Sequence, residues 1–130
     1  MTQAAATDLD PVSASTMAVL QNHMAAMNTM DPATIAADYA EDCVVMTTFA
    51  DGPVRGRAGI EAWVKTDLAE MMKALGSPTG DVEPEYTLKT LVADGEYGYL
   101  VVELGGNRRG TETYHIRDGK ILFESATFFL

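Results

Sequence analysis

The chain has 130 residues, of which 47% are hydrophobic and 22% are charged, and its formal net charge is −10. This length and composition fit one globular domain that can bury its own core. The acidic balance argues against nucleic acid and anionic membrane surfaces as partners, because phosphate binding needs clustered Lys and Arg.

The first part of the chain predicts a leader followed by a helix. Residues 1–11 are rich in Ala, Thr and Asp and are expected to be flexible, ahead of a single domain over residues 12–130. Apolar side chains then recur at helical spacing over residues 12–30 and form one stripe, Met17, Leu20, Met24 and Met27. Ser13 or Ser15 would cap this helix. His23 lies on the same stripe, so its side chain should face the interior.

The middle of the chain predicts a second helix, a strand and a third helix. Asp31-Pro32 is typical of a helix start, and this short helix should end near Glu41-Asp42. Residues 43–49 are rich in β-branched side chains and predict a strand. A third helix is predicted over roughly residues 57–75, with an apolar face that contains Ile60, Trp63, Val64, Leu68, Met71, Met72 and Leu75.

Four consecutive strands are predicted over residues 82–130, joined by turns at Asp94-Gly95, Gly105-Gly106-Asn107 and Asp118-Gly119. Asp-Gly between alternating apolar runs is typical of a two-residue hairpin loop, because both loop residues need positive φ. Two-residue loops fix the register. The expected pairs are Thr90 with Tyr99, Arg117 with Lys120, Tyr114 with Phe123, and Glu112 with Ser125. In the middle hairpin Tyr99 would face Tyr114, but the glycine pair allows a shift by one residue.

This register sorts the side chains onto two faces, because alternate residues of a strand point opposite ways. The first face would be aromatic with a few polar groups, as in a ligand pocket; it would collect Tyr86, Leu88, Thr90, Val92, Tyr97, Tyr99, Val101, Glu103, Glu112, Tyr114, Ile116, Ile121, Phe123, Ser125, Thr127 and Phe129. The second face would carry an apolar strip formed by Leu100, Val102, Leu104, Leu122, Phe128 and Leu130. Such a strip is too long to leave exposed and predicts a homodimer through this outer face.

The order of elements predicts the α+β class, with helices on one face of a mainly antiparallel sheet. Three motifs support a more specific prediction: residues 31–45 (DPATIAADYAEDCVV), residues 56–63 (GRAGIEAW) and residues 118–121 (DGKI). Together they resemble the nuclear transport factor 2-like superfamily, in its SnoaL-like and ketosteroid isomerase-like branch. The resemblance implies a cone-shaped roll, in which a strongly curved sheet wraps three helices from the N-terminal half and leaves a cavity between them.

The resemblance also implies positions for functional residues. Relatives of ketosteroid isomerase use a tyrosine on the first helix, a carboxylic acid on the sheet and an aspartate base. These positions fall on His23, on Glu112, and on Thr47 or nearby Thr48. One donor is therefore replaced, the acid is kept and the base is lost, which argues against steroid isomerisation by that mechanism. SnoaL-like cyclases often carry an aspartate on the last strand, where this chain would turn Ser125, Thr127 and Phe129 inward.

Glu112 and His23 are the candidate catalytic residues. On an aromatic face the Glu112 carboxyl would lose solvation, and Glu103 nearby on that face would disfavour a second negative charge, so Glu112 should tend towards the neutral acid. A neutral acid can donate to a carbonyl or act as general acid. His23 could serve as base if it reaches Glu112 or a pocket tyrosine. The alternatives are a carboxyl that only fixes the sheet and a histidine that is part of the core.

The expected substrate-binding residues are Tyr39, Trp63, Tyr99, Glu103, Tyr114, Phe123 and Ser125, although a core would use the same residue types. No metal-spaced set of ligands and no phosphate loop can be argued from the sequence, so we expect no cofactor. The single cysteine, Cys43, excludes an internal disulfide and favours a cytoplasmic protein. Two functions remain open: acid/base chemistry on a small apolar carbonyl or polycyclic molecule, and a non-catalytic ligand-binding or dimerisation module.

Overall fold

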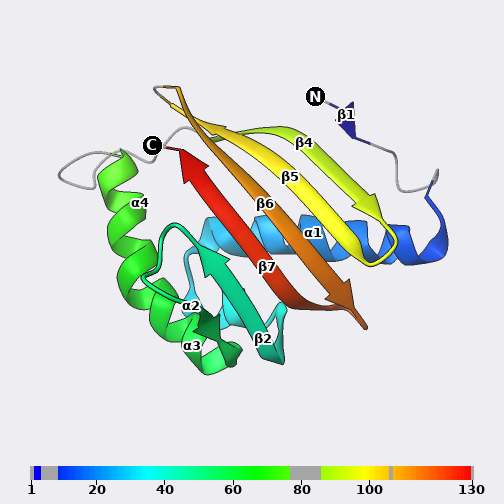
Figure 1. Ribbon diagram of the computed structural model, residues 1–130, viewed down its shortest axis with the longest axis horizontal. Helices are drawn as coiled ribbons and strands as arrows, with labels where there is room; N and C mark the ends of the chain where they lie inside the picture. The colour runs from blue at the N-terminus through cyan, green and yellow to red at the C-terminus, as the bar shows by residue number, and fades with distance from the viewer. Residues whose placement is uncertain (1, 4–8, 77–85, 106, 130) are drawn as a thin grey trace.

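The computed structural model describes residues 2–3, 9–76, 86–105 and 107–129. A curved sheet forms one layer and the helices cover one of its faces, with α1 crossing behind the strands (Figure 1). The helices are α1 (Pro11–Thr29), α2 (Pro32–Ala36), α3 (Gly56–Trp63) and α4 (Ala69–Gly76), and a π-helical turn, η2 (Val64–Leu68), joins the last two. The helical residues thus form three segments, α1, α2 and the continuous run from α3 to α4. The arrangement is the predicted α+β cone.

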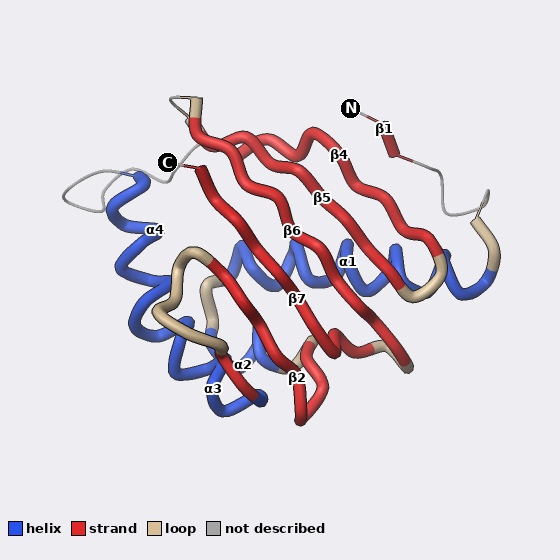
Figure 2. The backbone as a smooth tube through the Cα atoms, in the orientation of Figure 1, coloured by secondary structure: helices blue, strands red, loops and turns tan. Residues whose placement is uncertain are grey.

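In the described part of the chain seven strands form one sheet in the order β1-β4-β5-β6-β7-β2-β3 (Figure 2). Their bounds are β1 (Thr2–Gln3), β2 (Tyr39–Thr47), β3 (Val54–Arg55), β4 (Tyr86–Asp94), β5 (Tyr97–Leu104), β6 (Arg108–Arg117) and β7 (Lys120–Phe129). The four strands from β4 to β7 are antiparallel neighbours, as predicted. The expected strand start at residue 82 lies outside the described residues.

The first helix begins earlier than predicted. Asp10, not Ser13 or Ser15, is the N-cap: its carboxylate accepts from the backbone N–H of Ser13 at 2.9 Å, and Pro11 follows at the first helical position. The predicted stripe is confirmed, because Met17 and Leu20 are buried and His23 lies among them. Short β1 pairs in parallel with β4, while most of the predicted leader lies outside the described residues.

The second helix is shorter than predicted. Asp31 caps it through Thr34 at 3.0 Å, as expected, but the helix ends at Ala36 rather than near Glu41-Asp42. The chain leaves the helix because β2 pairs with β7: Ile121 donates its backbone N–H to the Asp38 carbonyl at 2.9 Å. Strand pairing overrides the helical pattern here. The third predicted helix is confirmed over Gly56–Gly76, with Ile60, Val64 and Leu68 buried.

The last predicted turn is present, the first lies one residue later than predicted, at Gly95-Glu96, because Asp94 pairs with Tyr97, and most predicted pairs were wrong. Arg117 pairs with Lys120 as expected, across Asp118 and Gly119 at positive φ. A bulge between His115 and Ile116 then shifts β7 by one residue. In place of the expected partners, Tyr114 faces Glu124, Glu112 faces Ala126, Tyr99 faces Val92 and Thr113, and Thr90 faces Val101. In the middle hairpin the last pair is Leu104 with Arg108, and Gly106 lies outside the described residues.

A shift of one residue turns a strand over. β5 and β7 are turned over relative to the prediction, and so is the part of β4 that pairs with β5 from Thr90 on, where Leu91 and Ala93 are buried in place of Val92. The expected outer strip is therefore largely core: Leu100, Val102 and Leu104 are buried, and Phe128 packs against the core. Leu122 is half-buried, and Leu130 lies outside the described residues. The outer face instead exposes Met46, Val92, Tyr97, Tyr99 and Phe129. No helix of the described residues is long and apolar enough to cross a membrane.

Candidate active site

A pocket of about 160 Å³ lies between the sheet and the helices α1, α3 and α4. Its wall is mostly apolar and rich in sulfur and aromatic rings: Met24, Met27, Met30, Phe49, Trp63, Leu68, Met72, Leu104, Ala126 and Phe128. Four polar side chains line it, Asn28, Thr47, Glu112 and Glu124. An apolar pocket on which a few polar groups converge is the usual form of a small-molecule site.

Two carboxyl groups enter this pocket from neighbouring strands. Glu112 of β6 points inward as predicted, and Glu124 of β7 points inward because the bulge beside His115 turned its strand over. Glu124 is buried, whereas Glu112 keeps some accessible surface, which faces the pocket. The partner carboxyl predicted from the sequence was Glu103, but that side chain lies on the other face of the sheet and forms an ion pair with Lys89 at 3.7 Å.

Each of the two glutamates accepts a hydrogen bond from a buried tyrosine. The Tyr114 hydroxyl donates to Glu112 Oε1 at 2.5 Å, and the Tyr39 hydroxyl donates to Glu124 Oε1. Burial raises the pKa of both tyrosines well above 10, so both hydroxyls stay protonated. The tyrosines lie behind the carboxyl groups rather than on the pocket wall, so they orient the glutamates towards the cavity.

Glu112 is the neutral member of the pair. Burial raises its pKa from 4.5 to about 8, with the negative charge of Glu124 as the next cause; the Tyr114 hydrogen bond and the charge of His23 act in the opposite direction. The pocket shields the carboxyl from bulk water although part of its surface is accessible. At neutral pH the pair therefore holds a proton on Glu112, which can donate, beside a carboxylate that can accept.

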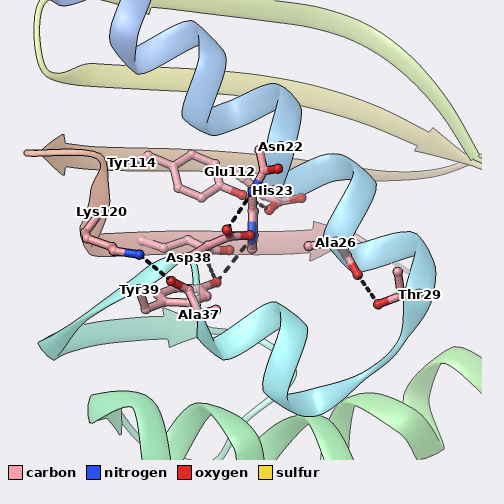
Figure 3. Close-up of polar contacts among 11 residues, drawn as sticks. Asn22, His23, Ala26, Thr29, Ala37, Asp38, Tyr39, Glu112, Tyr114 and Lys120 are labelled. Carbon is pink, nitrogen blue, oxygen red and sulfur yellow. Dashed lines mark hydrogen bonds and ion pairs between the residues drawn. The ribbon is translucent and has the colours of Figure 1, made fainter.

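His23 lies behind this pair and does not line the pocket. Its Nδ1 is 3.2 Å from Oδ2 of Asp38, and its Nε2 is 3.4 Å from the Tyr39 hydroxyl oxygen. Figure 3 shows the ring between Tyr114 and Glu112 on one side and Asp38 and Tyr39 on the other. Burial lowers the pKa of His23, but the hydrogen bond to Asp38 and the charges of Glu124, Glu112 and Asp38 outweigh it and raise the pKa above 6.5.

Asp38 connects this network to the surface. Its second oxygen accepts from Asn22 Nδ2 at 2.8 Å, and both residues line a broad surface groove of about 620 Å³ between α1 and α2. The side chain of Asp38 is 11% exposed, against 1% for His23. The buried His23 ring therefore lies between Asp38, which borders the groove, and the two pocket glutamates.

The predicted site residues divide into two groups. The first group lies together: His23 and Tyr39 are joined by one hydrogen bond, Tyr114 and Glu112 by another, and the His23 and Tyr114 rings meet edge to face with centroids 5.8 Å apart. Trp63 lines the pocket next to them. Tyr99, Glu103, Phe123 and Ser125 lie on strands whose register differs from the prediction, and they face away from the pocket.

Two residues that sequence reasoning missed are central to the cluster. Glu124 would have been found by allowing one bulge after Asp118-Gly119, since that change alone brings it beside Glu112 and Tyr114. Asp38 lies inside the 31–45 motif, but the predicted helix hid its position at the start of β2. Within the described residues, no group of three or more His, Cys, Asp and Glu side chains could hold a metal ion.

Comparison with known proteins identifies the family and the fold. The model of the SnoaL-like domain family matches residues 20–123. Among curated proteins, no sequence matches the chain. A protein of unknown function from Mesorhizobium loti, described as nuclear transport factor 2-like, superposes with a TM-score of 0.69 at 18% identity and covers 94% of this chain and 97% of its own.

Two further solved structures carry functional descriptions. A candidate ketosteroid isomerase from Kribbella flavida superposes with a TM-score of 0.68 at 20% identity, covering 91% of this chain and 80% of its own. An LEH-like epoxide hydrolase from M. tuberculosis superposes with a TM-score of 0.64 at 17% identity, covering 92% of this chain and 86% of its own. At these identities the similarity shows the fold alone.

Proposed function

We propose that this chain, which belongs to the SnoaL-like domain family, is an acid/base enzyme for a small, largely apolar molecule that carries a carbonyl or epoxide oxygen. One observation supports this most strongly: Glu112 and Glu124 face the same apolar pocket, one of them protonated at neutral pH. Glu112 would donate its proton to the substrate oxygen, and Glu124 would take a proton from carbon or from an attacking water. The similarity to an epoxide hydrolase and to a candidate ketosteroid isomerase is consistent with this proposal.

The pocket volume favours a small substrate. Sites for drug-sized ligands measure roughly 300–1,000 Å³, while this pocket measures about 160 Å³. A molecule with one ring fits that space better than the polycyclic class. The wall offers thioether and aromatic surfaces, so binding would come mainly from burial of apolar area.

The experiment compares wild type with Glu112→Gln and Glu124→Gln. Deuterium uptake at the α-carbon of small cyclic ketones and hydration of small cyclic epoxides are followed by NMR in D2O. Loss of a positioned acid or base should lower the rate by about 10²–10⁴-fold. Glu103→Gln is the matched control, because Glu103 lies on the opposite face of the sheet. Full activity in both pocket variants would rule out the proposed roles.

A non-catalytic ligand-binding module is the second candidate. Thr47 lines the pocket where relatives of ketosteroid isomerase have their base, and a threonine does not ionise in the range of a general base. A wild-type protein that binds the ketones, as seen by the fluorescence of Trp63 at the pocket wall, but does not exchange their protons would favour this module.

A further inference from the structure

The carboxyl pair raises the question of which glutamate holds the proton. The two groups have matching near surroundings, because each accepts one hydroxyl hydrogen bond from a buried tyrosine. The two groups differ in what contacts their tyrosines. The hydroxyl oxygen of Tyr39, which donates to Glu124, is 3.4 Å from Nε2 of His23. Among the described residues, no histidine nitrogen makes a hydrogen bond to the Tyr114 oxygen.

The hydrogen-bond pattern defines the charge of His23. Tyr39 gives its single hydroxyl proton to Glu124, so its oxygen can only accept from His23 Nε2. On the other side, Nδ1 faces Asp38, whose carboxylate oxygens can only accept, one of them already from Asn22. Both ring nitrogens are then donors, which is the pattern of an imidazolium.

We propose that protonated His23, clamped between Asp38 and Tyr39, fixes Glu124 as the carboxylate of the pair and so leaves the shared proton on Glu112. The positive ring polarises the Tyr39 hydroxyl towards Glu124, and this strengthens the hydrogen bond to the ionised form. His23 is thus a positioning residue that acts through Tyr39 and does not touch the substrate. Its catalytic meaning rests on the proposed function, in which Glu112 is the acid and Glu124 the base.

The charges around His23 support an imidazolium at this depth. The ionisable groups that face it are Asp38 before β2, Tyr39 on β2, Glu112 and Tyr114 on β6, and Glu124 on β7. Two carboxylates and one neutral acid thus surround one cation, and the two tyrosines remain neutral. Buried charges persist only when they are paired and hydrogen-bonded, and both ring nitrogens meet that condition. Asp38 at the groove would give the ring its route to solvent protons.

The test is NMR of the free protein, with ¹⁵N detection of the His23 ring and ¹³C detection of the glutamate carboxyl carbons. At pH 6 we expect both His23 nitrogens to be protonated, a carboxylate shift for Glu124 and a protonated-acid shift for Glu112. In His23→Gln, and in Tyr39→Phe as the second variant, the difference between the two carboxyl shifts should shrink. Tyr39→Phe removes only the hydroxyl that links ring and carboxylate, so it keeps the test valid if His23→Gln does not fold.

Asp38→Asn provides a second readout. Loss of an opposite charge at hydrogen-bonding distance should move the His23 titration down by about 1–3 pH units. Asn22→Ala is the matched control, because it removes the other hydrogen bond to Asp38 but keeps the charge. A single protonated nitrogen on His23 at pH 6, or an unchanged carboxyl pattern in both His23→Gln and Tyr39→Phe, would overturn the inference. Neither readout uses activity, so a failure of the proposed enzyme function would show separately, in Glu112→Gln and Glu124→Gln.

Discussion

The buried acid Glu112 should make the protein lose stability as the pH rises. Its pKa is raised from 4.5 to about 8 in the folded state, so between these values the folded chain holds a proton that the unfolded chain has released. The stabilisation is complete below pH 4.5 and is lost as the pH rises to about 8. Each pH unit in this window corresponds to ~1.4 kcal/mol. The free energy of unfolding should therefore fall by at most ~5 kcal/mol across the window.

Glu112→Gln removes this dependence while keeping the shape of the side chain. A glutamine is neutral at every pH, its carbonyl can still accept from Tyr114, and its amide can donate towards Glu124. The variant should thus show a flatter stability curve and become more stable than wild type near pH 8. The raised pKa of His23 lowers stability in the same direction above pH 6.5. The hydrogen bond to Asp38 and the charge of Glu124, which raise this pKa more than Glu112 does, remain in the variant, so most of the His23 contribution is common to both proteins.

The assay is urea unfolding followed by circular dichroism at pH 5, 6, 7, 8 and 9, with free energies taken from linear extrapolation. The quantity of interest is the difference in pH slope between wild type and Glu112→Gln, since shared contributions cancel. Glu103→Gln, on the opposite face of the sheet, should follow wild type. Equal slopes for wild type and Glu112→Gln would refute the reasoning that the carboxyl is neutral in the fold.

Three further predictions concern packing and assembly. Gly98→Ala would place a Cβ 2.7 Å from Leu20 Cδ1 and should cost about 1–3 kcal/mol in urea unfolding, while Gly52→Ala, with no atom within 4 Å, should cost little. Thr16→Val would remove the 2.6 Å hydrogen bond that ties α1 to the β4–β5 turn, and a loss of about 1–2 kcal/mol in the same assay is expected. Tyr99 is 40% exposed on the outer face; if that face joins two copies, light scattering should give a dimer for wild type and a shift towards monomer for Tyr99→Arg, whereas a monomeric wild type would reject the dimer.

The local elements followed from the sequence because their signals are local. Proline after aspartate marked the start of α2. The same signal at Asp10-Pro11 was overlooked, so α1 was assigned to the wrong cap. Apolar spacing marked the buried side of each helix. Asp118-Gly119 gave the last turn and the pair Arg117 with Lys120. His23 and Glu112 could be selected because one lies on a buried helical stripe and the other on a strand whose facing residues are apolar.

The partner of Glu112 depended on long-range pairing. A β-bulge inserts one extra residue into a strand, and in this chain no residue type near the bulge marked its place in the sequence. The one after His115 brought Glu124 into the pocket and turned Phe123 and Ser125 away from it. The end of α2 was also a tertiary effect, because pairing with β7 drew Asp38 out of the helical pattern and placed it against His23.

The sequence alone thus determined most of the elements and two of the ionisable groups, because propensity, capping and turn chemistry act over a few residues, and the family of the fold followed from the resemblance of three motifs. Only the tertiary structure decided that Glu124 is the second carboxylate of the pocket and that Asp38 contacts His23. The physical reason is the two-residue period of a strand: a displacement of one position exchanges its faces, and only the packing of the whole sheet selects between them.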